Sequence, residues 1–209
     1  ATVGASKAEL ATQNVLFPSP ADGTIINGNT ITTSLAADLE PEYVTATNEI
    51  AYVSLQENNA LAIVDLSDNS VSIKALGFKS WDGLQIDAQE DGTVSFGQYD
   101  GLVGAYMPDT ITNYTWNGSP FIVTANEGDA REYFFDVADE AACTAANGLD
   151  YDVDDGCLAW IDEYKIKDIE DAGITVQADS ALEKYLDSDI DSLRITMAAG
   201  DMDNNGELD

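Results

Sequence analysis

The chain has 209 residues, enough for one large domain, and its charge is its most unusual property. Thirty-nine acidic residues stand against eight basic ones, there is no histidine, and the formal net charge is −31. The negative electrostatic potential of such a chain excludes nucleic acid and anionic membranes as partners. It attracts cations, and it suits a medium of high salt concentration, in which the charges are screened. The missing histidine excludes Ser-His-Asp and Cys-His catalytic machinery.

No apolar run approaches the roughly 20 residues needed to cross a bilayer, so no membrane insertion is expected. The chain starts with Ala1 and shows no signal peptide, which fits a processed or excised polypeptide.

The first 40 residues predict a mixed lead-in, with a short helix within residues 8–16 and a brief strand at 30–32. From residue 50 the pattern predicts β-structure. Residues 50–55 and 60–66 read as strands, and residues 71–75 alternate apolar with polar side chains as a third strand does. Three consecutive antiparallel strands make most of one blade of a β-propeller.

A motif occurs twice, seventy residues apart. Residues 53–59 read VSLQENN and residues 123–129 read VTANEGD, so an apolar strand is followed in both by an amide, a carboxylate and a turn. Repetition at one period in a β context predicts the equivalent sheets of a propeller, whose loops converge on a central channel. Glu57 and Glu127 are then expected at equivalent places on neighbouring blades.

Residues 111–125 predict a second blade, with Asn117-Gly118 as a hairpin turn of the primed type. After residue 129 the pattern changes, and residues 130–142 predict a helix. Ser180 and Glu183 form a capping-box pattern at the start of another short helix, and residues 194–197 predict a strand. Residues 1–209 are therefore interpreted as one mainly β fragment of a propeller, in which residues 130–190 are a small helical and acidic insertion.

Cys143 and Cys157 are the only cysteines. Because no histidine is present to share a metal with them, we expect a disulfide that closes an acidic loop of about 15 residues. A disulfide implies an oxidising, extracytoplasmic compartment.

The C-terminal loop, residues 201–209 (DMDNNGELD), carries the sharpest metal signal. Oxygen-bearing side chains at positions 1, 3 and 5, followed by glycine at position 6, are the front half of an EF-hand-type calcium loop. Asp201, Asp203 and Asn205 are predicted to bind calcium through their side chains, Glu207 through its carbonyl, and Asp209 directly or through water. A polar turn is the alternative, because the ligand usual at position 12 is not present.

A second alternating acidic stretch, residues 150–156 (DYDVDDG), lies inside the cysteine loop. Asp150, Asp152 and Asp154 are candidate calcium ligands, although Gly156 falls one place late for the standard loop. A solvated acidic loop is the alternative here.

The repeated loops supply a third set of candidates. Paired carboxylates can perform acid–base catalysis or hold a metal, but Asn- and Asp-rich strand ends also build β-turns. The candidate catalytic residues are Glu42, Glu57, Asp109, Glu127, Asp129 and Arg131.

Several stretches resemble the choice-of-anchor I family. They are residues 39–43 (LEPEY), 52–62 (YVSLQENNALA), 76–79 (LGFK), 106–109 (YMPD) and 124–131 (TANEGDAR). The loop at 201–209 also resembles a calcium-like loop of that family. The resemblance implies a secreted or cell-surface β-propeller whose members are often labelled alkaline-phosphatase-like or cell-surface glycoprotein. Since such proteins are several hundred residues long, the chain resembles a central fragment, and its expected partners are the remaining blades of a larger protein or assembly.

Two functions remain open from the sequence. The first is an extracellular calcium-binding propeller that acts as a surface binding or structural module. The second is a metal-dependent phosphoesterase whose ions are held by carboxylates of the repeated loops. The absence of a standard catalytic set favours the first.

Overall fold

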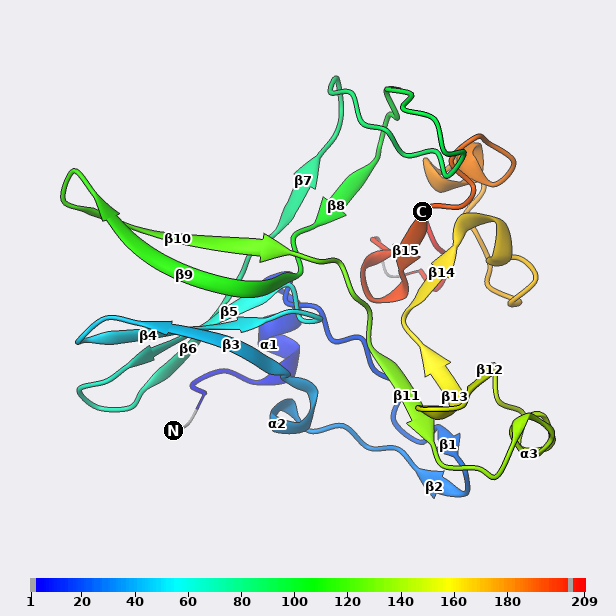
Figure 1. The fold of residues 1–209 in the computed structure, drawn as a ribbon, viewed down its shortest axis with the longest axis horizontal. Coiled ribbons are helices and arrows are strands. Elements are labelled where there is room, and N and C mark those ends of the chain that lie inside the picture. Colours follow the sequence, from blue (N-terminus) through cyan, green and yellow to red (C-terminus); the bar gives the residue numbers. More distant parts are fainter. Residues whose placement is uncertain (1–2, 203–204) are drawn as a thin grey trace. The chain divides into compact units, whose positions relative to one another are not determined.

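A computed structural model describes residues 3–202 and 205–209 and shows a mainly β chain (Figure 1). The chain divides into two compact units. Unit 1 comprises Ala1–Phe17, Ser34–Ser80 and Val103–Asp129, and unit 2 comprises Pro18–Thr33, Trp81–Leu102 and Ala130–Asp209. Both units are thus assembled from segments that are separate in the sequence.

Unit 1 contains a four-stranded antiparallel sheet whose strands follow chain order. They are β3 (Pro41–Ala46), β4 (Ile50–Leu55), β5 (Ala60–Asp65) and β6 (Val71–Ala75). Alternation of apolar side chains buries Leu55, Ala60, Ala62 and Ile73 in one cluster with residues of the N-terminal segment. The three strands predicted from residue 50 onward are therefore confirmed, and β3 completes their sheet.

The lead-in contributes helix α1 (Lys7–Ala11), which buries Leu10 against this sheet. Ser6 and Glu9 form a capping box at its start. The helix is shorter than predicted because Asn14, with φ of 65°, turns the chain out of the helical conformation. A second short helix, α2 (Leu35–Asp38), leads into β3.

A long, curved hairpin of β9 (Pro108–Trp116) and β10 (Ser119–Asn126) also belongs to unit 1 (Figure 1). Asn117 and Gly118 both have positive φ, 49° and 79°, as the predicted primed turn requires. The side chain of Asn113 donates to the hydroxyl of Thr45, with 2.6 Å between nitrogen and oxygen, and so joins β9 to β3.

Of the two predicted blades, the first corresponds to a four-stranded antiparallel sheet, β3 to β6, whereas the second, predicted over residues 111–125, does not. β9 and β10 form a two-stranded sheet, and so do β7 (Phe78–Ser80) and β8 (Val103–Ala105). Residues 81–102, which lie between β7 and β8 in the sequence, are rich in Gly and Asp, and these residues favour turns over strands. No closed propeller is present in the described part of the chain, so the propeller interpretation is unconfirmed.

The described part of unit 2 holds three small sheets. One is a hairpin of β1 (Ile25–Ile26) and β2 (Asn29–Thr30). The second has the order β11 (Glu132–Phe135), β13 (Gly156–Ile161), β12 (Asp150–Asp152), and in the third β14 (Glu163–Lys165) pairs with β15 (Arg194–Thr196). A second apolar cluster contains Ile166, Ile169, Leu182 and Leu208, so the unit has a core of its own. Its described residues also form the 3-10 helices η1 (Ile166–Asp168), η2 (Leu182–Tyr185) and η3 (Met197–Ala199).

The helix predicted over residues 130–142 is wrong. Residues Glu132–Phe135 form β11, because an aromatic run with alternating burial suits a pleated strand. Helix α3 (Glu140–Ala145) begins only after Asp139, whose carboxylate accepts the N–H of Ala142 at 2.9 Å as an N-cap.

Half of the predicted capping box at Ser180 is present. The Ser180 hydroxyl accepts the N–H of Glu183, but the Glu183 carboxylate binds the N–H of Asp179 instead of completing the box. The segment after Ser180 is the 3-10 helix η2.

The expected disulfide between Cys143 and Cys157 is present and links α3 to β13, with the two Cα atoms 5.2 Å apart. Among the described residues, none of the helices has the length and apolarity that a membrane span requires.

Candidate metal loop and paired motif

The C-terminal loop of unit 2 is closed at its base by main-chain hydrogen bonds. The N–H of Asp209 donates to the carbonyl of Gly200 at 2.8 Å, and Leu208 pairs in parallel with Val176. Leu208 is 4% exposed and belongs to the unit 2 core. The two ends of the loop are therefore fixed to a packed part of the unit.

Inside the loop the backbone bends around one carboxylate. Asp201 accepts the N–H of Asn205 on one oxygen at 3.0 Å and the N–H of Gly206 on the other at 2.8 Å. The Asn205 side-chain oxygen accepts the N–H of Glu207 at 2.8 Å, and Gly206 has a φ of 94° that suits glycine. The Asp209 carboxylate accepts the N–H of Met202 at 3.2 Å.

The loop carries Asp201, Asn205, Glu207 and Asp209 on one short segment, and predicted ligand Asp203 lies outside the described residues. Carboxylate, amide and carbonyl oxygens are the donors that calcium takes, and a backbone already bent around Asp201 fits a calcium loop. Across residues 3–202 and 205–209, no three acidic or cysteine side chains are grouped to hold a metal by themselves. Backbone carbonyls and the side chain of Asp203 would have to complete the set of metal ligands.

The second acidic stretch forms a hairpin turn between β12 and β13. Asp152 accepts the N–H groups of Asp154 and Asp155 at 2.6 and 3.1 Å, and Asp150 accepts the N–H of Tyr151. Asp150 and Asp152 are alternate residues of one strand and Asp154 lies in the turn. A calcium site here remains a prediction.

The first copy of the repeated motif carries two fully buried amides. Asn58 donates to the carbonyls of Leu16 and Asp38, both at 2.9 Å, and accepts the N–H of Glu40. Asn59 donates to the carbonyl of Gly77 at 2.8 Å. These two side chains join the lead-in, the start of β3 and the end of β6 to one turn.

Both copies of the motif meet at Met107. The side-chain oxygen of Asn59 accepts the N–H groups of Tyr106 and Met107 at 2.9 and 3.1 Å, and the N–H of Glu127 donates to the Met107 carbonyl at 3.2 Å. Met107 is buried and has a φ of 42°, which is uncommon for a residue other than glycine. The motif is therefore a structural junction in unit 1.

The two copies differ in the path of the chain after the strand. In the first copy, residues 56–59 connect the paired strands β4 and β5. In the second copy, the chain leaves the sheet after β10 and continues through residues 127–131. Both Glu57 and Glu127 follow a strand, but β4 is an inner strand of a four-stranded sheet and β10 belongs to a two-stranded one, so their expected equivalence on neighbouring blades is not found.

The candidate catalytic residues are spread over both units. Glu42, Glu127 and Asp129 are exposed, and Glu57 and Asp109 are half-buried, all in unit 1. Arg131 belongs to unit 2, where it is buried and donates to the hydroxyl of Ser19 at 2.9 Å.

Asp162 is a buried carboxylate that the sequence analysis missed. It is 2% exposed, it accepts the N–H of Ala198 at 3.0 Å and the hydroxyl of Thr196, and its own N–H donates to the Arg131 carbonyl. Burial raises the pKa of Asp162 to about 6, although the two hydrogen bonds and the Arg131 charge oppose the shift. Its position directly after the apolar run 156–161 was the available signal.

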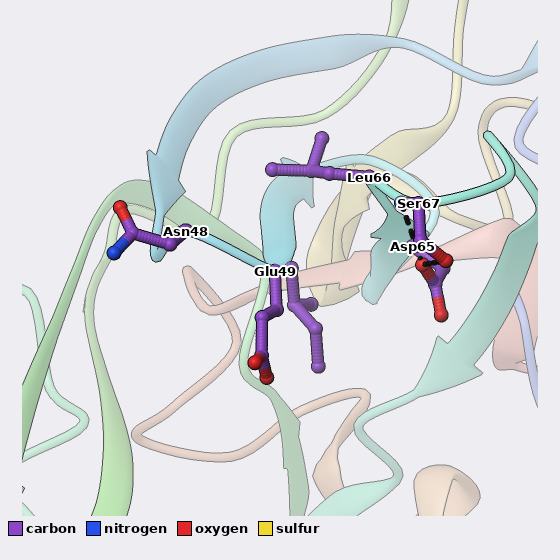
Figure 2. A pocket seen from close by; sticks show the side chains of 6 residues that line it. Asn48, Glu49, Asp65, Leu66 and Ser67 are labelled. Atoms are coloured by element: carbon purple, nitrogen blue, oxygen red, sulfur yellow. Dashed lines mark hydrogen bonds between the residues drawn. The ribbon is translucent and has the colours of Figure 1, made fainter.

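A shallow cleft of about 340 Å³ lies at one end of the four-stranded sheet, at the β3–β4 and β5–β6 turns (Figure 2). Its lining includes two carboxylates, Glu49 and Asp65. Asp65 accepts the N–H and the hydroxyl of Ser67, and these bonds lower its pKa. The cleft contains none of the predicted site residues.

These features define a mainly β chain with a disulfide and an acidic, oxygen-lined loop. The choice-of-anchor I domain family matches residues 2–208, so the chain belongs to that family. A stretch of 60 residues is 50% identical to the mesenchyme-specific cell surface glycoprotein of Strongylocentrotus purpuratus. That stretch covers 28% of this chain and spans only 8% of the length of that relative. No solved structure matches the chain.

Proposed function

We propose that this chain is part of an extracellular, surface-associated protein and acts there as a calcium-binding β-sheet module for binding or structural support. The observation that carries the proposal is the loop from Gly200 to Asp209, which is closed at its base and bent around the Asp201 carboxylate. Its oxygen donors match the preference of calcium, and the net charge of −31 favours cations over anions.

Calcium bound at this loop would neutralise carboxylates that otherwise repel one another, and so would stabilise the fold of unit 2. Asp201, Asp203, Asn205 and Asp209 would supply side-chain oxygens, and Glu207 its carbonyl. Because Leu208 joins the loop to the core of unit 2, order in the loop is expected to raise the stability of that unit.

The surface location has separate support. The disulfide between Cys143 and Cys157 is of the kind that persists in oxidising compartments. The family is that of choice-of-anchor I domains, and the partly matching relative is described as a cell surface glycoprotein.

The proposal extends to the remaining blades of a larger protein or assembly as partners. Residues 110–126 contain no charged residue, although the chain is strongly acidic. The hairpin that they form exposes Tyr114, Trp116, Phe121 and Val123, a composition typical of the core of a protein interface.

The test of the calcium proposal is isothermal titration calorimetry of the parent chain, the Asp201→Asn variant and the Asp171→Asn control. Asp201→Asn removes a central carboxylate of the loop, whereas Asp171 is exposed and lies outside it. We expect saturable calcium uptake in the parent and the control, weakened about tenfold or more in Asp201→Asn. Equal uptake by all three would contradict the proposal, as would equal heats with magnesium at the same ionic strength.

The same samples also test the alternative function, a metal-dependent phosphoesterase. A module without catalysis leaves a generic phosphomonoester intact with or without calcium. Turnover that needs the metal and stops on chelation would instead assign a metal-dependent phosphoesterase.

A further inference from the structure

Gln177 approaches the proposed calcium loop from another part of unit 2. The main chain of residues 175–177 pairs with Leu208: the N–H of Leu208 donates to the Thr175 carbonyl at 2.9 Å, and the N–H of Gln177 donates to the Leu208 carbonyl at 2.7 Å. The pairing sets Gln177 beside the loop, where its side-chain oxygen accepts the side-chain NH₂ of Asn205 at 2.9 Å.

This bond matters because Asn205 is the one amide among the predicted side-chain ligands. A carboxamide has an oxygen end and a nitrogen end of nearly equal size, and only the oxygen end can bind a cation. A carboxylate at the same position would offer oxygen at both ends. The orientation of the amide therefore decides whether Asn205 is a ligand.

Two hydrogen bonds among the described residues favour one orientation. The nitrogen end donates to Gln177, and the oxygen end accepts the N–H of Glu207 at 2.8 Å on the side of the loop. Reversing the amide would place two donors against each other at Glu207 and, with Gln177 in its observed orientation, two acceptors against each other at Gln177. Both changes are unfavourable.

We propose that Gln177 is a positioning residue for the calcium loop. Gln177 holds the nitrogen end of the Asn205 amide, so that the oxygen end of Asn205 faces the loop. The inference rests on the proposed calcium function. It assigns to the site a residue 24 positions before Asp201, outside the loop motif, which contacts no ion itself and acts through Asn205.

The first experiment measures calcium affinity by calorimetry in Gln177→Leu, Gln177→Glu and the control Thr175→Val. Leucine cannot accept a hydrogen bond, so affinity is expected to fall by about fivefold to tenfold, the equivalent of one lost hydrogen bond. Glutamate keeps the acceptor and should bind calcium at least as tightly as the parent. Thr175→Val leaves the main-chain pairing in place and should bind as the parent does.

The second experiment repeats Gln177→Leu in an Asn205→Asp background. Because the carboxylate of that background carries oxygen at both ends, orientation no longer matters, and the effect of Gln177→Leu is expected to shrink to within about twofold. An equal loss of affinity in both backgrounds would show that Gln177 merely holds the fold together, and would overturn the inference.

The two proposals fail in different ways. A parent chain that takes up no calcium overturns the calcium function and this inference with it. A parent that binds calcium, with Gln177→Leu binding equally well, overturns the role of Gln177 alone and leaves the calcium loop standing.

Discussion

Asn59 shows how a motif that resembles a catalytic loop can be a structural junction. Its amide makes three hydrogen bonds to backbone groups, and its φ of 48° lies in the left-handed region that asparagine tolerates better than most residues. The residue is fully buried, so each partner left without its bond would have no water to replace it.

Replacing Asn59 by Ala is therefore expected to lower the free energy of unfolding by about 2–4 kcal/mol. Asn59→Gly loses the amide but tolerates the left-handed φ, so comparing it with Asn59→Ala separates the contribution of the hydrogen bonds from that of the backbone conformation. Urea unfolding measures both variants, with the exposed Asn48→Ala as control. A loss below about 0.5 kcal/mol in Asn59→Ala would contradict the junction.

Asp162 predicts a pH dependence of stability. Its pKa in the folded state, about 6, lies above the usual 3.8, so the folded state holds a proton between these values that the unfolded state has released. The contribution of Asp162 to the free energy of unfolding is fully present below about pH 4 and is lost as the pH rises through 6. The loss amounts to up to about 3 kcal/mol. Asp162→Asn should remove this part of the slope in pH-dependent urea unfolding, whereas Asp171→Asn should keep it. Parallel curves for parent and Asp162→Asn would contradict the assignment.

At the scale of elements, the disulfide ties α3 to β13 across the acidic hairpin. Cys143→Ser combined with Cys157→Ser is expected to destabilise the folded chain by about 3 kcal/mol, the cost typical of opening a loop of this length. Melting of the double variant beside the parent measures the effect. An unchanged melting temperature would show that the bond adds nothing to stability.

Local pattern allowed several elements to be predicted. The strands β4, β5 and β6 follow from alternation of apolar residues, and the β9–β10 turn follows from Asn117-Gly118, because both signals act between neighbouring residues. The strand β11 was mistaken for a helix because its pairing partner, β13, lies more than twenty residues away. The aromatic run of residues 133–135 was a local sign of the strand, but the pairing itself acts over a distance that local patterns do not show.

The candidate site, like the fold, could be predicted only where its residues lie close together in the sequence. The spacing of Asp201, Asn205 and Gly206 marks the loop, since its predicted ligands lie on one continuous segment. Gln177 and Asp162 could not be assigned from spacing, because their partners are brought to them only by the folding of unit 2.

At the scale of the whole molecule, charge and its local absence are the informative features. The chain carries a net charge of −31, yet the β9–β10 hairpin between residues 110 and 126 has no charged residue and exposes aromatic side chains. If further blades cover this face, amide hydrogen exchange in β10 should be slower in a longer protein that contains the chain than in the chain alone. Strand β6 supplies the internal reference, and equal exchange of β10 in both proteins would count against the partner proposal.

The most direct test of the calcium module is a crystal structure of the calcium-loaded chain with an anomalous difference map. We expect a calcium peak about 2.3–2.6 Å from side-chain oxygens of Asp201, Asp203 and Asn205 and from the Glu207 carbonyl, with Asp209 bound directly or through a water. A loop without a peak at saturating calcium, or a peak held elsewhere in the chain, would contradict it.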